Sequence, residues 1–158
     1  MNQKPKVYLD TSVISHLFQD EKPEAQGYTI EFWEKIKGGE FEVFISRIVF
    51  EEMKKAPKDK YDLMKTELEK IAYNDIYISD EILELSAEII SMGILPPKSV
   101  NDSIHIAAAL IGECDYLATW NMKHLANVKT NEGVRSVVLK DDLKQLMLLT
   151  PNMFLGGA

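Results

Sequence analysis

Short β-favouring runs alternate with amphipathic helical segments along most of the chain, and this order is the strongest constraint on its fold. The predicted strands are residues 7–9, 41–45, 76–78 and 116–119, and two more short apolar runs follow at 137–139 and 146–149. Strands separated by helices favour a mainly parallel sheet covered by helices. We therefore expect an α/β fold, a three-layer α/β/α sandwich around a mainly parallel sheet.

Capping and helix-breaking residues mark the ends of the helical segments. Helices are predicted over residues 13–18, 28–37, 58–72, 82–90 and 104–111, with a shorter one between Ser46 and Pro57. Gly38 ends one of them, and Ser79 or Asp80 precedes another as its N-cap. The stretches 19–26, 56–60 and 128–133 are predicted loops.

The size and composition of the chain predict one globular domain over residues 1–158. Its 158 residues, 46% of them hydrophobic and 27% charged, suffice for one core and leave little room for a second. No apolar run approaches the about 18 residues that cross a membrane, so we expect a cytoplasmic protein with no membrane contact. Cys114 is the only cysteine, which excludes an internal disulfide and leaves oxygen or imidazole ligands for any metal.

The formal charge of −7 argues against a protein that coats nucleic acid along a whole basic face. A nucleic acid enzyme of this charge needs lysines that gather locally. The lysines nearest the motifs described below are Lys54, Lys55, Lys58, Lys60, Lys98, Lys123 and Lys129. These side chains either attract a phosphate backbone or form ordinary solvated surface.

Three acidic residues stand where parallel strands would bring them together. Asp10 ends the first strand, Glu52 lies in the helix after the second, and Asp102 opens a helix that leads into a later strand. Sites in open parallel sheets collect beyond the carboxyl ends of the strands, and three carboxylates there repel one another unless a cation lies between them. Oxygen ligands suit Mg²⁺ or Mn²⁺, either of which would support hydrolysis of a phosphodiester.

Each of these acids also has an ordinary structural interpretation. Asp10 and Asp102 stand where a helix N-cap would stand. Glu52 lies beside Glu51 and two lysines, as on any solvated helix face. Taken singly, none of the three indicates a site.

Four stretches of the sequence match a known family in their order and spacing. They are residues 8–14, residues 45–46 with 49–53, residues 101–107, and residues 115–121. On these stretches the chain resembles the PIN-domain family and its VapC-like toxin ribonucleases, over nearly its whole length. The resemblance implies an α/β/α fold, Mg²⁺- or Mn²⁺-dependent cleavage of RNA, and in many members a toxin role restrained by an antitoxin protein. Family members often form homodimers.

The resemblance also implies which residues form the site. Asp10, Glu52 and Asp102 correspond to the catalytic acids that bind metal in the family. Glu52 is chosen over Glu51 because the family acid stands six residues after the serine that ends the strand, here Ser46, and just before an apolar residue.

One position departs from the family pattern. Many members carry a fourth acid after the last matching strand, where this chain has Asn121. A neutral amide can ligate through its carbonyl oxygen but supplies no charge to a second cation. We therefore expect one metal ion, or a second that binds weakly. Asp115 precedes that strand and is expected at the opposite edge of the sheet.

Further polar residues are candidates for supporting the acids or contacting the substrate. Thr11 and Ser12 can donate hydrogen bonds to Asp10 or to phosphate, and serve equally well as helix caps. Asn101 can orient Asp102 or cap its helix.

The histidines and tryptophans have structural interpretations beside their functional ones. His105 lies in an apolar helix, which favours a hydrogen-bonded structural histidine over a general base or metal ligand. His124 is better placed to contact a substrate phosphate, and His16 is expected to be structural. Trp33 and Trp120 are expected in the core or an interface rather than as base-stacking platforms.

Three hypotheses follow. The first is a metal-dependent endoribonuclease, the toxin of a toxin-antitoxin pair. The second is a PIN fold without catalysis that binds RNA or protein, with Asn121 as a sign of a decayed site. The third is a phosphohydrolase with Asp10 as covalent nucleophile, which ranks below the others because Ser12 stands where haloacid dehalogenase-like enzymes have a second Asp.

Overall fold

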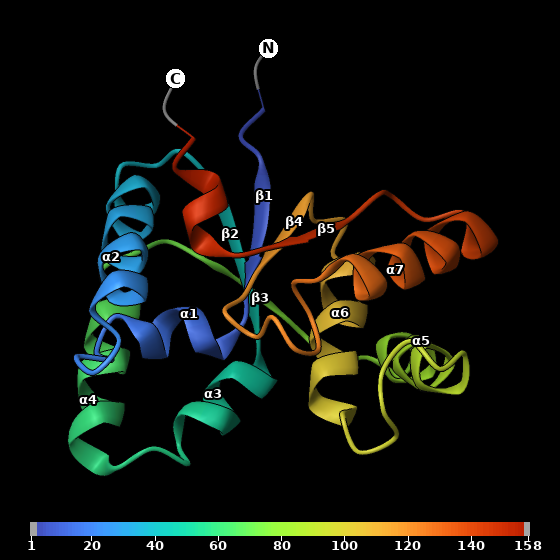
Figure 1. Cartoon of the computed structure of the whole chain (residues 1–158), viewed down its shortest axis with the longest axis horizontal. Coiled ribbons are helices and arrows are strands. Elements are labelled where there is room, and N and C mark those ends of the chain that lie inside the picture. Colours follow the sequence, from blue (N-terminus) through green and yellow to red (C-terminus); the bar gives the residue numbers. More distant parts are fainter. Residues whose placement is uncertain (1–2, 157–158) are drawn as a thin grey trace.

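A five-stranded parallel sheet runs through the centre of the structure, a computed structural model that describes residues 3–156 (Figure 1). The strands are β1 (Lys6–Leu9), β2 (Glu42–Ser46), β3 (Asn74–Ile76), β4 (Tyr116–Ala118) and β5 (Met147–Leu149). Their order across the sheet is β3-β2-β1-β4-β5, and every neighbouring pair is parallel. The predicted α/β fold with a parallel sheet is confirmed.

Helices cover both faces of the sheet. They are α1 (Thr11–His16), α2 (Pro23–Lys37), α3 (Arg47–Met53), α4 (Lys58–Leu68), α5 (Asp80–Ser91), α6 (Val100–Ile111) and α7 (Val128–Asp141), with a short 3-10 helix, η1 (Pro151–Phe154). Figure 1 shows α1 to α4 on one side and α5 to α7 on the other. No helix among residues 3–156 is long and apolar enough to span a membrane.

The alternation of side chains along β1 divides the core into two halves. Val7 and Leu9 pack into a cluster with residues of α1 to α4, whereas Tyr8 packs into a second cluster with residues of α5 to α7. Successive residues of a strand point to opposite faces, so a strand buried on both faces carries no polar side. The sheet therefore separates two cores, as in a three-layer sandwich.

Two predicted loops are helical instead. α2 begins at Pro23, because proline fits the first turn of a helix, and so it takes up part of the predicted loop 19–26. α7 includes the predicted loop 128–133 and the run 137–139. The side chain of Asn127 caps α7 by accepting a hydrogen bond from the amide of Thr130. The cap lies directly before polar residues of the kind that are common in loops, and for this reason the helix was not predicted.

The remaining differences are at the ends of elements. β3 ends at Ile76 rather than at residue 78, and Tyr77 is 83% exposed. α4 spans Lys58–Leu68, which includes part of the predicted loop 56–60 and stops short of residue 72. These ends lie away from the acids, so they do not alter the site.

The direction of the strand order reverses at β1 and β4, and we call the region beyond the carboxyl ends of these two strands the crevice. The chain moves outward from β1 to β2 and β3, and then returns to β4 on the other side of β1. Connections leave neighbouring strands in opposite directions at such a point, which is where open α/β sheets bind ligands. The backbone amide of Asp10 donates to the carbonyl of Ala118, and this hydrogen bond of 3.1 Å joins the two strand ends.

Candidate metal centre

Asp10 lies at the end of β1 with its carboxylate held by two hydroxyl groups. Its Oδ2 accepts hydrogen bonds from Ser12 Oγ at 2.8 Å and from Thr119 Oγ1 at 2.6 Å. The residue occupies the N-cap position of α1, but its side chain makes no capping hydrogen bond. The capping interpretation of Asp10 is therefore wrong, and the carboxylate is fixed within the crevice with only 6% of the residue exposed.

Glu52 faces the same crevice from α3. Its Oε1 accepts a hydrogen bond from Thr11 Oγ1 at 2.5 Å, and its Oε2 accepts one from Asn101 Nδ2 at 3.4 Å. Glu51 points away and pairs with Arg47 at 3.3 Å on the surface. The structure thus brings Glu52, and not Glu51, to the crevice. Asn101 contacts Glu52 rather than orienting Asp102.

His105 lies between Asp10 and Glu52. Its Nε2 is 2.8 Å from Glu52 Oε1 and 3.4 Å from Asp10 Oδ1, and the side chain is fully buried. The candidate ligand atoms of these three residues all lie within 4.8 Å of one another. His105 is hydrogen-bonded, as predicted, but it also belongs to the acidic cluster, which its position in an apolar helix did not indicate.

A chain of buried hydrogen bonds supports His105 from behind. Its Nδ1 lies 2.7 Å from the hydroxyl of Tyr8, which in turn lies 2.8 Å from Ser46 Oγ. Burial holds the pKa of Tyr8 well above its ordinary value, so this hydroxyl stays protonated. Tyr8, Ser46 and Thr119 were not predicted as parts of the site. Their only sequence signal is a polar group in, or directly after, a buried strand.

The charges of the cluster are mutually dependent. Burial opposes ionisation of Glu52, but hydrogen bonds from His105, Thr11 and Asn101 outweigh it and lower its pKa. Burial likewise opposes protonation of His105, but the hydrogen bond to Glu52 and the charges of Asp10, Glu52 and Asp102 outweigh it and raise its pKa. The acids thus stabilise the protonated form of His105 relative to an isolated histidine.

Asp102 lies in the first turn of α6, outside the group formed by Asp10, Glu52 and His105. Asn121 Nδ2 donates to its Oδ2 at 3.4 Å. Burial, followed by the charges of Asp10 and Glu52, raises the pKa of Asp102. The N-cap position of α6 is Ser99, so Asp102 does not cap its helix. Asp102 is therefore near enough to be affected by the charges of Asp10 and Glu52, although it is not part of the group of ligand atoms that lie within 4.8 Å of one another.

The other predicted residues surround this cluster. The Oγ of Ser12 accepts a hydrogen bond from the amide of Trp120 at 2.9 Å while it donates to Asp10. The amide of His124 donates to Asn121 Oδ1 at 3.0 Å, which places His124 at the rim near Asp102. Nδ1 of His16 lies 2.7 Å from the carbonyl of Ser12, in agreement with a structural role.

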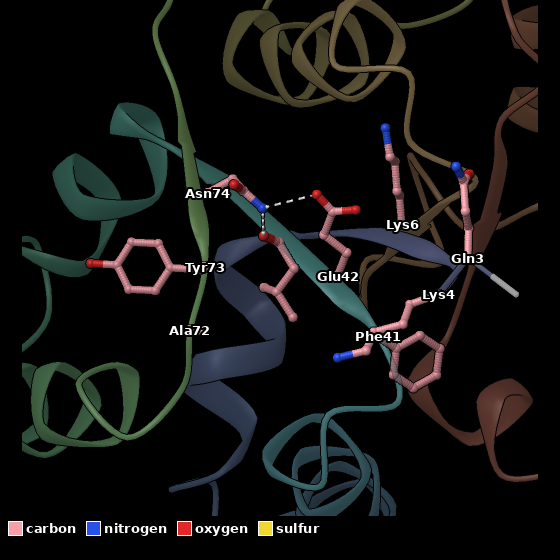
Figure 2. Close-up of a pocket in the computed structure, with 9 residues that line it drawn as sticks. Gln3, Lys4, Lys6, Phe41, Glu42, Ala72, Tyr73 and Asn74 are labelled. Carbon is pink, nitrogen blue, oxygen red and sulfur yellow. Dashed lines mark hydrogen bonds between the residues drawn. The ribbon is translucent and has the colours of Figure 1, made fainter. Parts of the chain in front are cut away.

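Asp115 lies at the opposite edge of the sheet, as predicted. Its carboxylate accepts a hydrogen bond from the amide of Lys6 at 2.8 Å and pairs with Lys144 at 3.0 Å. A hollow of about 550 Å³ opens at this same edge, by the amino ends of β1 and β2 (Figure 2). Lys4, Lys6 and Glu42 contribute its charges, and none of its lining residues belongs to the acidic cluster.

Removing the Tyr8 hydroxyl should destabilise the protein. Tyr8→Phe keeps the packing of the ring but leaves two buried polar atoms, Ser46 Oγ and His105 Nδ1, without their hydrogen-bond partner. We expect the free energy of unfolding to fall by about 2 kcal/mol, measured by urea denaturation at neutral pH. Tyr77→Phe, at an 83% exposed position, is the matched control. If Tyr8→Phe lowers the free energy of unfolding no more than the control does, these buried hydrogen bonds do not stabilise the protein as expected.

Removing the charge of Asp102 should stabilise the protein. A carboxyl whose pKa is raised on folding binds its proton more tightly in the folded state, so its contribution to stability falls as the pH rises through that pKa. Asp102→Asn should therefore raise the melting midpoint by a few degrees at neutral pH. The gain should shrink as the pH is lowered and wild-type Asp102 becomes protonated. A variant that melts below wild type at neutral pH in the presence of EDTA would refute this.

Comparison with known proteins agrees with this architecture. No curated protein sequence matches the chain. The structure is similar to that of VapBC2 from Rickettsia felis bound to a DNA fragment from their promoter, with a TM-score of 0.56 and 15% sequence identity. That similarity covers 91% of this chain and 97% of the other, and it concerns the fold. The PIN domain family model matches residues 7–128, which include all three acids of the crevice. Since the match covers well over half of the chain, the protein belongs to the PIN domain family.

Proposed function

We propose that the protein is a divalent-metal-dependent endoribonuclease, in which Asp10, Glu52 and Asp102 hold Mg²⁺ or Mn²⁺ beside a phosphodiester of RNA. PIN domains are generally nucleases, and the chain belongs to that family. The observation that carries the proposal is the meeting of Asp10 and Glu52, from separate elements, at the carboxyl edge of the sheet, where their charges also act on Asp102.

The residues of the crevice fit a hard divalent cation. Carboxylate oxygens are the preferred ligands of Mg²⁺ and Mn²⁺, and Asp10, Glu52 and Asp102 supply them. Burial, followed by the charges of Asp10 and Glu52, raises the pKa of Asp102, so a cation at the acids would favour its ionised form. When bound, the ion supplies charge neutralisation and a more acidic water molecule for hydrolysis.

The surrounding residues prepare the acids for this task. Ser12 and Thr119 orient Asp10, whereas Thr11, Asn101 and His105 orient Glu52. Donors that are fixed in advance hold a charged group in one geometry without reorganisation.

Two further residues, Asn121 and His124, are part of the proposed site on the side that faces the substrate. Asn121 adds no charge beside Asp102, which favours a single cation. His124 stands at the rim, where its imidazole can contact a phosphate of the substrate.

We further propose that the protein acts as the toxin of a toxin-antitoxin pair, with an antitoxin protein as its partner and a homodimer as its assembly. Family membership and the fold shared with the Rickettsia felis VapBC2 support this. Expression of the protein alone should arrest growth, and co-expression of a small protein from the neighbouring reading frame should restore it. Normal growth during strong expression of the soluble, folded protein would count against the toxin role.

The nuclease proposal is tested by incubating the protein with an end-labelled single-stranded RNA in Mg²⁺, in Mn²⁺ and in EDTA. We expect cleavage with either metal ion and intact RNA in EDTA. Intact RNA in all three, together with no heat of Mn²⁺ binding by calorimetry at millimolar metal, would favour a PIN module without catalysis.

A further inference from the structure

A pocket beside the acidic cluster gathers positive charge in an otherwise acidic chain. It has a volume of about 460 Å³ and lies between residues 94–96, which precede α6, and residues 122–130, which lead into α7. Its charged or ionisable lining residues are Lys123, His124 and Lys129, and no Asp or Glu lines it. We call it the basic pocket. The whole chain carries 25 acidic residues against 18 lysines and arginines, so two lysines and a histidine without an acid are a local reversal of sign.

The two lysines of the basic pocket are not engaged elsewhere in the part of the chain that the structure describes. Lys140 pairs with Glu88 at 3.3 Å and Lys144 with Asp115 at 3.0 Å. Within residues 3–156, neither Lys123 nor Lys129 donates a side-chain hydrogen bond or forms an ion pair, and both are exposed. Their charges are therefore available to an anion from outside.

The segment that carries these residues is held in place rather than loose. The side chain of Asn127 accepts a hydrogen bond from the amide of Thr130 at 2.7 Å. It also donates to the carbonyls of Met122 at 2.9 Å and Lys123 at 3.1 Å. The hydroxyl of Thr130 donates to the carbonyl of His124 at 2.7 Å. The backbone beneath the three basic side chains thus has a fixed course.

Two hydrogen bonds connect the basic pocket to the acids. The amide of His124 donates to Asn121 Oδ1 at 3.0 Å, and Asn121 Nδ2 donates to Asp102 Oδ2 at 3.4 Å. A phosphodiester beside a metal ion at the acids would therefore have the basic pocket as its neighbour. The apolar side chains of Ile94, Leu95 and Met122 line the same pocket and offer contact surface to the uncharged parts of a nucleotide.

We propose that the basic pocket binds the phosphate of the nucleotide next to the scissile one, so that the RNA strand runs from the acidic cluster past Asn121 toward Lys123 and Lys129. The inference rests on the proposed function, because the neighbouring phosphate is placed by the scissile phosphate at the acids. Every nucleotide of a strand carries a phosphate, so a strand cut at Asp102 must pass a second negative charge close by. Lysines bind phosphate as point charges without reading the base, so this contact sets the course of the strand and not its sequence.

The test is the salt dependence of RNA binding by the wild-type protein with Ca²⁺ in place of Mg²⁺, so that an oxygen-binding cation can occupy the acids, with the RNA checked after each titration to be intact. The affinity of a labelled single-stranded RNA is measured by fluorescence anisotropy over a range of KCl concentrations. Lys123→Gln with Lys129→Gln should weaken binding about tenfold at low salt and reduce the slope of log affinity against log salt by about 1.4, which is about 0.7 for each lysine that no longer neutralises a phosphate. The matched control is Lys4→Gln with Lys65→Gln, which removes the same charge from two exposed lysines that neither line the basic pocket nor lie near the matching motifs. The control should leave the slope unchanged.

Two outcomes would overturn the inference. Equal slopes for the two double variants would mean that the basic pocket makes no special contact with RNA. Competition by poly-glutamate as strong as that by unlabelled RNA would assign the pocket to an acidic peptide. Metal-dependent cleavage by the wild-type protein is scored separately, so the pocket can fail while the nuclease proposal stands. If RNA is bound through the basic pocket but is never cleaved, the nuclease proposal is refuted and the binding of RNA by the pocket stands.

Discussion

Asp10→Asn is expected to lower the rate of metal-dependent RNA cleavage by about a thousandfold or more, which corresponds to about 4 kcal/mol of lost transition-state stabilisation. The amide has nearly the shape of the carboxylate, and its oxygen can still accept the hydrogen bonds of Ser12 and Thr119. The substitution removes the negative charge that attracts a cation to the crevice. The rate is measured in Mg²⁺ or Mn²⁺ with enzyme in excess over labelled RNA.

Asp115→Asn is the matched control for this variant. Asp115 lies at the opposite edge of the sheet, where it accepts from the amide of Lys6 and pairs with Lys144. Its substitution should lower the melting midpoint slightly and leave cleavage within about twofold of wild type, because a partly exposed ion pair contributes little. Asp10→Asn should melt close to wild type, since the amide oxygen can keep the hydrogen bonds of Ser12 and Thr119. Retained cleavage in folded Asp10→Asn would refute its assignment as a catalytic ligand.

Glu52→Gln should reduce cleavage about a hundredfold, while Glu51→Gln should change it less than about twofold. The two residues are neighbours in α3 and differ only in direction. Glu52 meets Thr11 and His105 in the crevice, whereas Glu51 pairs with Arg47 at the surface. Each substitution removes one charge from the same helix. Any difference in cleavage rate between the two variants therefore results from the position of the substituted side chain.

The pair of variants also decides the assignment made from spacing to Ser46. A large loss of cleavage in Glu51→Gln, with none in Glu52→Gln, would mean that Glu51 and not Glu52 belongs to the site. It would also contradict the orientation of α3. Thermal melting of both variants shows whether a loss of cleavage is caused by unfolding of the protein. Cleavage at several Mn²⁺ concentrations then separates weaker metal binding from slower chemistry, since excess Mn²⁺ rescues only the former.

The sheet and its functional edge could be predicted because their signals are local. A buried strand such as residues 7–9 is a short apolar run, and the acid that follows it must emerge at the carboxyl edge of a parallel sheet. Helices that begin with polar residues were harder to predict. α7 was concealed because its first turns carry Lys129, Thr130 and Asn131, and only Thr130 of these is buried. A pattern over so few residues cannot distinguish that turn from a loop.

The contacts within the candidate site could not be read from the sequence for a different reason. His105 and Glu52 are 53 residues apart, and their hydrogen bond depends on how α3 and α6 pack against the sheet. Tyr8, in the middle of β1, reads as one more apolar strand residue until its hydroxyl is found between Ser46 and His105. Long-range polar pairs of this kind follow from tertiary packing, which the spacing of apolar residues does not specify.

The most direct test of the proposed metal site is anomalous diffraction from crystals of the protein grown with saturating Mn²⁺. We expect an anomalous peak within bonding distance of carboxylate oxygens of Asp10, Glu52 and Asp102. The peak should be absent from crystals of Asp10→Asn grown in the same way. A wild-type crevice without a peak, or a peak bound only by other residues of the chain, would contradict the proposed metal site.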